Sequence, residues 1–161
     1  FEWEKPLSAT KEIDARIDIM IQALFKELPR RAFVIMPYAA EFDTLYELVI
    51  HPAITGLRHE VHRLDRMDQA GKIIEQIEKG IATADYCIVV LDELRHNVLY
   101  EMGFAHALGK PLIIILSKGT LNGARVPFDI STFSRIEYER PNAEMVKKLA
   151  RAARKVDANL R

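Results

Sequence analysis

Three short apolar runs constrain the fold of this chain more than any other feature. Residues 32–36, 86–91 and 112–116 are almost continuously apolar, and each is bounded by charged or turn-forming residues. Strands that are buried on both faces have this composition, and they occur mainly in parallel sheets covered by helices. Weaker strand patterns at 60–65 and 134–138 bring the expected number of strands to five.

Helical patterns alternate with these runs. Apolar residues at the 3.6 spacing predict helices at about 9–28, 42–57, 73–81, 98–108 and 145–160. Pro52 is expected to kink the second helix or to end it early. The alternation predicts an α/β domain over residues 31–161, a flavodoxin/Rossmann-like three-layer sandwich with a mostly parallel five-stranded sheet in the order 2-1-3-4-5. Residues 1–30 are expected to form an extra N-terminal helical extension.

Composition excludes several classes of protein. The chain has 161 residues, of which 49% are hydrophobic and 29% charged, as in a globular domain with an ordinary core. The single cysteine, Cys87, excludes a disulfide framework and favours a reducing, cytoplasmic setting. The histidines show no metal-ligand spacing with it, so we expect no metal and no cofactor. No apolar run approaches the roughly 20 residues of a membrane span, and we expect no membrane contact.

The charges cancel in sum but are unevenly distributed. The chain has 23 basic and 23 acidic residues. Residues 41–101 carry 12 acidic and 6 basic side chains, whereas residues 144–161 carry 2 acidic and 6 basic ones. Proteins that bind nucleic acid concentrate cations on one face. The acidic middle of the chain therefore argues against a nucleic-acid partner.

The expected strand order selects a candidate site. In a sheet of order 2-1-3-4-5, ligands bind at the carboxyl ends of strands 1 and 3, which points to Tyr38 and Asp92. Asn97 is expected to cap the next helix and to place Glu101 one turn above it on the same face. Both acids also have a purely structural interpretation. Glu101 could be present because the helix dipole stabilises acidic side chains near a helix N-terminus, and Asp92 because aspartate is common in turns.

A longer motif surrounds Glu101. The segment Asn97–Pro111, Asn-Val-Leu-Tyr-Glu-Met-Gly-Phe-Ala-His-Ala-Leu-Gly-Lys-Pro, resembles the signature of the nucleoside 2-deoxyribosyltransferase-like superfamily, which is similar in fold and site placement to TIR domains. The resemblance spans roughly residues 32–138. It includes four further segments: Phe33–Tyr38, Arg63–Asp65, Ala84–Asp85 and Pro127–Ile130.

The resemblance implies chemistry at an N-glycosidic bond, with Glu101 as the catalytic carboxylate. Breaking such a bond builds positive charge on the sugar, and a fixed carboxylate stabilises that charge or traps the sugar covalently. Tyr38, Asp65 or Asp92 would protonate or hydrogen-bond the leaving base, and Asn97 is a further candidate for substrate binding. The expected substrate is a small molecule, a nucleoside, a nucleotide or an NAD-like dinucleotide, and both hydrolysis and transfer remain open.

Two alternatives to an enzymatic function remain open. The likeness to TIR domains also implies a non-catalytic or conditionally active nucleotide-sensing or effector domain of a larger bacterial defence or signalling protein. A first residue other than Met and an extra helix fit a chain cut from a longer protein. A third interpretation is an assembly unit, because the first helix has an apolar face and the last helix is basic. We therefore expect a homo-oligomer, at least a dimer.

Overall fold

The computed structural model describes residues 6–64, 73–92, 94–120, 133 and 135–160. The chain divides into two compact units, one containing helix α1 (Pro6–Glu27) and the other running from Arg30 to Leu160. The expected N-terminal helix is therefore present. None of the described helices is long and apolar enough to cross a bilayer.

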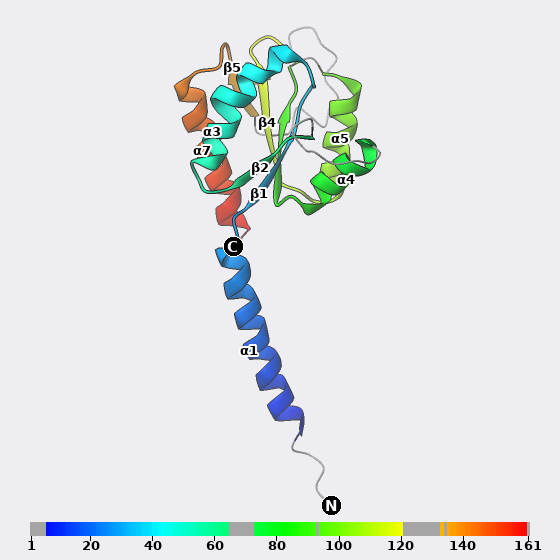
Figure 1. The fold of residues 1–161 in the computed structure, drawn as a ribbon, viewed down its shortest axis with the longest axis vertical. Helices are drawn as coiled ribbons and strands as arrows, with labels where there is room; N and C mark the ends of the chain where they lie inside the picture. The colour runs from blue at the N-terminus through cyan, green and yellow to red at the C-terminus, as the bar shows by residue number, and fades with distance from the viewer. Residues whose placement is uncertain (1–5, 65–72, 93, 121–132, 134, 161) are drawn as a thin grey trace, which may run out of the picture. The chain divides into compact units, whose positions relative to one another are not determined.

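The second unit alternates strands with helices (Figure 1). Its strands are β1 (Arg31–Ile35), β2 (Glu60–His62), β3 (Tyr86–Val90), β4 (Leu112–Ser117) and β5 (Arg135–Tyr138). Its helical segments are η1 (Ala40–Phe42), α2 (Asp43–Leu45), η2 (Tyr46–Ile50), α3 (His51–Thr55), α4 (Ile73–Thr83), α5 (His96–Ala107) and α7 (Ala143–Asn159).

The five strands form one parallel sheet in the order β2-β1-β3-β4-β5, which confirms the predicted topology. The three apolar runs supply the three central strands, and all five residues of β3 are buried. The edge strands β2 and β5 are only partly buried. Because every pairing is parallel, all carboxyl ends lie at the same edge of the sheet, the upper edge in Figure 1.

Two apolar cores cover the two faces of the sheet and make the three-layer sandwich. Successive strand residues point to opposite faces. Val34 and Ile88 face one core, together with the helices between β1 and β2 and with α7. Phe33 and Val89 face the other core, together with α4 and α5. Figure 1 shows α3 and α7 on one side of the sheet and α4 and α5 on the other.

The helical stretch between β1 and β2 does not end at Pro52. Pro52 lies in the first turn of α3, directly after the π-helical turn η2. In a regular α-helix a proline ring clashes with the carbonyl group four residues earlier. Here the turn before it is wider, and the N–H of His51 donates to the carbonyl of Tyr46, five residues back. The helix therefore does not end early at Pro52, and a local widening of the helix precedes the proline.

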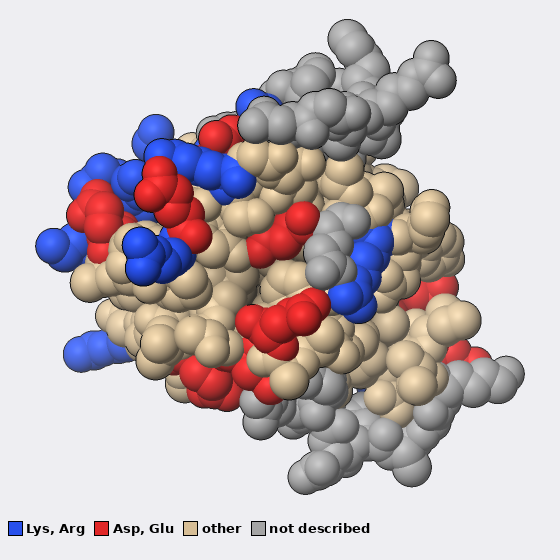
Figure 2. Space-filling model, turned by 90° about the horizontal axis from the view of Figure 1, so that it is seen from above, with Lys and Arg blue, Asp and Glu red and all other residues tan. Residues whose placement is uncertain are grey.

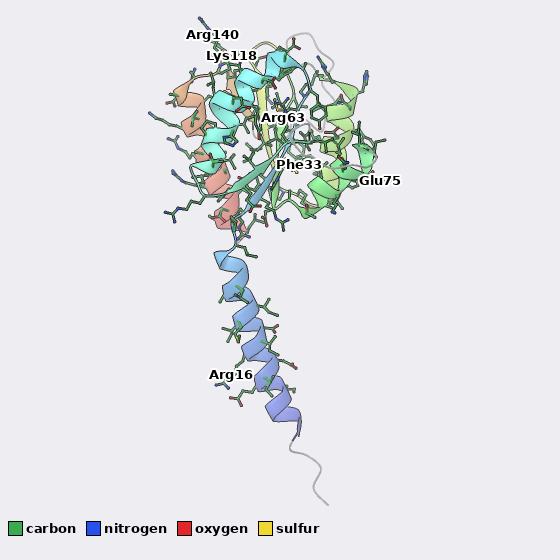
Figure 3. All side chains as sticks on the ribbon, in the orientation of Figure 1. Arg16, Phe33, Arg63, Glu75, Lys118 and Arg140 are labelled. Atoms are coloured by element: carbon green, nitrogen blue, oxygen red, sulfur yellow. The ribbon has the colours of Figure 1, made fainter. Side chains whose placement is uncertain are left out.

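Helix α4 packs closely against β1 because it carries glycine at position 80. A Cβ atom on Gly80 would lie 2.3 Å from a carbon of the Phe33 ring. That ring is 1% exposed and belongs to the core that α4 and α5 cover (Figure 3). The close approach of α4 to the sheet therefore requires the missing side chain.

Candidate active site

A cavity of about 360 Å³ lies between α4 and α5, beside the segment that follows β1. Its volume is in the range of small-molecule sites. The lining consists of Tyr38 after β1, then Asn97, Tyr100, Glu101 and Phe104 of α5, and Ile73, Ile74, Ile77, Glu78 and Ile81 of α4. The walls are mainly apolar and aromatic, and two carboxyl groups are set into them. This is the composition of a pocket that holds a flat apolar group and orients it with a few polar contacts.

Glu101 occupies a position of α5 that would normally be apolar. Val98, Met102 and Ala105, at helical spacing around it, are buried against the sheet, and Glu101 itself is only 4% exposed. Among the described residues, no group forms a hydrogen bond with its Oε2 atom. Burial raises the pKa of Glu101 from the ordinary 4.5 to about 7. A buried carboxyl group with a strongly shifted pKa beside a cavity is characteristic of functional sites.

Asn97 is not the helix cap that the sequence predicted. Helix α5 begins at His96, and Arg95 stands at the N-cap position, where its side chain forms no capping hydrogen bond. The reason lies in Leu94, whose φ of 48° turns the chain so that the helix starts earlier. Asn97 lines the cavity from the first turn. Glu101 consequently lies in the second turn of α5. The helix dipole stabilises acidic side chains mainly in the first turn, so it does not explain a glutamate at this position.

Asp92 is engaged elsewhere. One of its carboxylate oxygens accepts a hydrogen bond from the backbone N–H of Ser117, and the other accepts one from the hydroxyl group of Tyr138. Burial, followed by the bond to Asp92, raises the pKa of Tyr138. Asp92 thus ties together the ends of β3, β4 and β5, and it does not line the cavity.

The structure therefore brings together three of the predicted site residues, Tyr38, Asn97 and Glu101, and separates Asp92 from them. Asp65, like the Pro127–Ile130 segment, lies outside the described residues. The half-buried Glu78 joins the group, although sequence reasoning missed it. The sequence could have identified Glu78, because it lies between Ile74 and Ile81 on one face of the predicted helix, and a single acidic residue in an apolar helical face is unusual.

Arg63, part of the motif after β2, has a supporting position. Its side chain is 1% exposed, its Nη1 donates to Asp43 at 2.8 Å, and its guanidinium group lies 5.1 Å from the centre of the Tyr46 ring (Figure 3). A buried guanidinium is stabilised by such a carboxylate and aromatic face. Arg63 fixes the helices that follow Tyr38 to the end of β2.

Other candidate groups lie outside the cavity. Cys87 is buried, and burial raises the pKa of its thiol to about 12, so the reactive thiolate is scarce at neutral pH. The His106 ring contacts the Phe133 ring edge-on at 5.3 Å. Within the described part of the chain, no group of three or more His, Cys, Asp and Glu side chains could hold a metal ion. Figure 2, seen from above, shows acidic side chains near the middle of this face and Lys and Arg mainly on its left.

Comparisons with solved structures agree with this architecture. The CMP N-glycosidase BcmB of Clostridium botulinum matches with a TM-score of 0.57 and 21% identity over 76% of this chain and 99% of that one. The TIR domain of the Toll-related receptor TRR-2 of Hydra magnipapillata matches with a TM-score of 0.58 and 14% identity over 78% and 97%. A 2-deoxyribosyltransferase of Bacillus psychrosaccharolyticus matches with a TM-score of 0.51 and 16% identity over 72% and 95%.

The predicted resemblance is thereby confirmed at the level of the fold. The chain shares its architecture with an N-glycosidase, a deoxyribosyltransferase and a TIR domain. No family model matches the sequence, and no curated protein matches it at a significant level.

Proposed function

We propose that the protein breaks an N-glycosidic bond, or exchanges its base, in a nucleoside, nucleotide or NAD-like dinucleotide, with Glu101 as the catalytic carboxylate. The observation that carries this proposal is the buried carboxyl group of Glu101 in the wall of a largely apolar cavity, where burial raises its pKa to about 7. The fold shared with an N-glycosidase and a deoxyribosyltransferase supports it.

The chemistry follows from the electrostatics of a buried anion. A carboxylate in an apolar wall is poorly solvated, and positive charge that develops on the sugar restores the lost stabilisation. An oxygen of Glu101 bonds to the anomeric carbon as the carbon–nitrogen bond breaks, and the bonding electron pair leaves with the base. Water, or a second base, then attacks the same carbon and releases Glu101. Water gives hydrolysis, and a second base gives transfer.

The leaving base needs a proton or a hydrogen bond. With Asp92 engaged by Ser117 and Tyr138, we assign this role to Glu78 or Tyr38, both of which line the cavity. The isoleucines of α4 and the Phe104 ring supply the apolar surface against which a flat base would pack. Asn97 offers an amide group for the hydroxyl groups of the sugar.

Release of free base tests the proposal. The protein is incubated with nucleosides, nucleoside monophosphates and NAD, and the products are separated chromatographically. We expect Glu101→Gln to abolish release of the base and Glu78→Gln to reduce it. Glu75→Gln, which removes an exposed carboxylate of the same helix α4 outside the cavity lining, is the matched control and should retain activity. Base release that is unchanged in Glu101→Gln, or absent with every substrate, would contradict the proposal.

The likeness to a TIR domain favours a second candidate function. The same cavity would then bind a nucleotide as the sensing or effector domain of a larger bacterial defence or signalling protein, with little or no turnover. A thermal-shift series with the same compounds separates the two functions. A compound that raises the melting temperature and is recovered intact favours the sensing domain, whereas release of its base favours the enzyme.

The proposal includes a homo-oligomeric state. Sedimentation velocity detects it directly as a mass above the 18.4 kDa of one chain.

A further inference from the structure

A second hollow, of about 210 Å³, lies on the side of α4 toward the edge strand β2. Its lining comes from the first residues of β1, the last residue of β2 and the face of α4 that includes Gly80. Figure 1 shows α4 to the right of β1 and β2. None of its lining residues lines the cavity of the candidate active site, so α4 borders two separate hollows. We call this one the basic pocket, after the side chains that line it.

Three basic side chains line the basic pocket, and no described residue with a carboxyl group does. Arg31 and Lys79 are exposed, and neither forms an ion pair with another described residue. The third is the half-buried His62, whose Nε2 atom lies 3.4 Å from a carboxylate oxygen of Glu60. The lining therefore carries two full positive charges that no described carboxylate compensates.

The acid that follows the pocket in the chain does not compensate them. Asp85 accepts a hydrogen bond of 2.7 Å from the backbone N–H of Arg31, and its other oxygen lies 3.6 Å from the guanidinium group of Arg30. The side chain of Arg31 takes no part in either contact. The carboxylate of Asp85 thus holds the beginning of β1 in place and leaves the guanidinium group of Arg31 to the pocket.

The structure of α4 itself does not account for Lys79. Cations near the C-terminus of a helix stabilise the carbonyl groups that are left without partners there. At the end of α4 this role belongs to Lys110, whose ammonium group donates to the carbonyls of Ala82 and Ala84, both at 2.7 Å. The charge of Lys79 is therefore available to a ligand.

The apolar part of the lining limits the size of that ligand. It includes Phe33, which is 1% exposed, and the backbone of Gly80, which lies close to the Phe33 ring (Figure 3 labels Phe33). The volume of the pocket is below the roughly 300–1,000 Å³ of pockets that hold drug-sized ligands. The pocket is therefore too small for a whole nucleotide, but it has room for an anionic group with a few carbon atoms attached.

We propose that the basic pocket binds a small phosphate-bearing anion, either inorganic phosphate or a phosphate monoester with a few carbon atoms. A phosphate group has three terminal oxygens that accept hydrogen bonds, which matches three basic side chains. The planar fork of Arg31 and the ammonium group of Lys79 are both suited to phosphate oxygens. A carboxylate has only two oxygens and leaves one basic group without a partner. The carbon atoms of an ester pack against Phe33 and Gly80.

Titration calorimetry of the full chain tests the pocket, with inorganic phosphate, methyl phosphate and acetate as probes. The titration extends to about 10 mM, because a ligand with few non-hydrogen atoms binds weakly. We expect saturable binding of one phosphate probe per chain and at least tenfold weaker binding of acetate. Tighter binding of methyl phosphate identifies a monoester as the ligand, and tighter binding of inorganic phosphate identifies the free ion. Absence of saturable binding, or acetate bound as tightly as phosphate, would overturn the proposal.

Matched variants place the binding in this pocket. Lys79→Gln and Arg31→Gln each remove one contact with a charged group and should weaken binding of the phosphate probe by about tenfold or more. Lys147→Gln and Arg151→Gln remove the same charges from exposed positions of α7, outside the pocket, and should bind like the parent. Circular dichroism checks that all four variants are folded. If the pocket variants and the α7 variants bind phosphate equally well, the assignment is wrong, whether or not the protein releases a base.

Discussion

Replacing Glu101 by glutamine should make the protein more stable at high pH while abolishing its proposed activity. The carboxyl group is 4% exposed, and burial raises its pKa from 4.5 to about 7. The folded state therefore prefers the protonated form, whereas the unfolded chain ionises already above pH 4.5. Glutamine has nearly the same shape and never ionises, so it removes the cost of burying the charge.

The size of the effect follows from the two pKa values. A raised pKa in the folded state lowers stability as the pH rises from about 4.5 to about 7, and the cost is constant above that range. A tenfold change in an ionisation constant corresponds to about 1.4 kcal/mol, so the full cost is about 3 kcal/mol at pH 8. At pH 5 it is less than about 1 kcal/mol, because the unfolded chain is then only partly ionised. For a chain of this size, the cost at pH 8 corresponds to roughly 6–12 °C in melting temperature.

Urea denaturation of both proteins at pH 5, 6, 7 and 8 measures this difference. The variant should gain stability relative to the parent by about 2–3 kcal/mol between pH 5 and pH 8. Any cost of the new amide group is the same at every pH, so the change with pH isolates the ionisation of Glu101. If the difference in free energy of unfolding between the two proteins did not vary with pH, the claim that the buried charge of Glu101 destabilises the folded state would be refuted.

Three further predictions rest on the same structure. In urea denaturation, Gly80→Ala should lower the free energy of unfolding by roughly 1–3 kcal/mol, because its Cβ would lie 2.3 Å from a buried ring. Gly103→Ala is the control: a Cβ there would have no atom within 4 Å, and the substitution should leave the free energy of unfolding unchanged or raise it. Asp92→Asn and Tyr138→Phe should each cost roughly 1–2 kcal/mol, and the double variant should cost less than their sum if the hydrogen bond between them matters. If ionised Glu101 attacks the sugar, kcat/KM for base release should rise about tenfold per pH unit below pH 7 and be constant above it. A fall in kcat/KM as the pH rises would instead indicate that Glu101 acts as a proton donor.

The sheet could be predicted because its signals are local. Continuous apolar runs gave β1, β3 and β4, and the alternation of strands with helices leaves few topologies. The conformation around Pro52 could not be predicted, because a π-helical turn depends on how the helix fits the core and has no simple sequence pattern. The close packing of Gly80 on Phe33 joins residues far apart in the chain and is equally invisible to periodicity.

The candidate site was only partly predictable. Glu101 stood out through its neighbours in α5 and its place after β3, and Tyr38 through the end of β1. Asp92 met the same criterion, because it lies just after β3. Both of its carboxylate oxygens nevertheless accept hydrogen bonds from residues of β4 and β5. Such long-range hydrogen bonds cannot be predicted from the spacing of residues along the chain. Asn97 was given the wrong local role because the chain turns at Leu94, a residue that rarely adopts a positive φ.

The contact between Gly80 and Phe33 affects the shape of the cavity although neither residue lines it. Helix α4 supplies one wall of the cavity through Ile77, Glu78 and Ile81, and its distance from the sheet is limited by what fits between the helix backbone and the Phe33 ring. We expect a larger residue at position 80 to push this wall outward and a smaller side chain at position 33 to let it move inward. The size of the cavity can therefore change through the spacing of one helix from the sheet while every residue that lines the cavity stays the same.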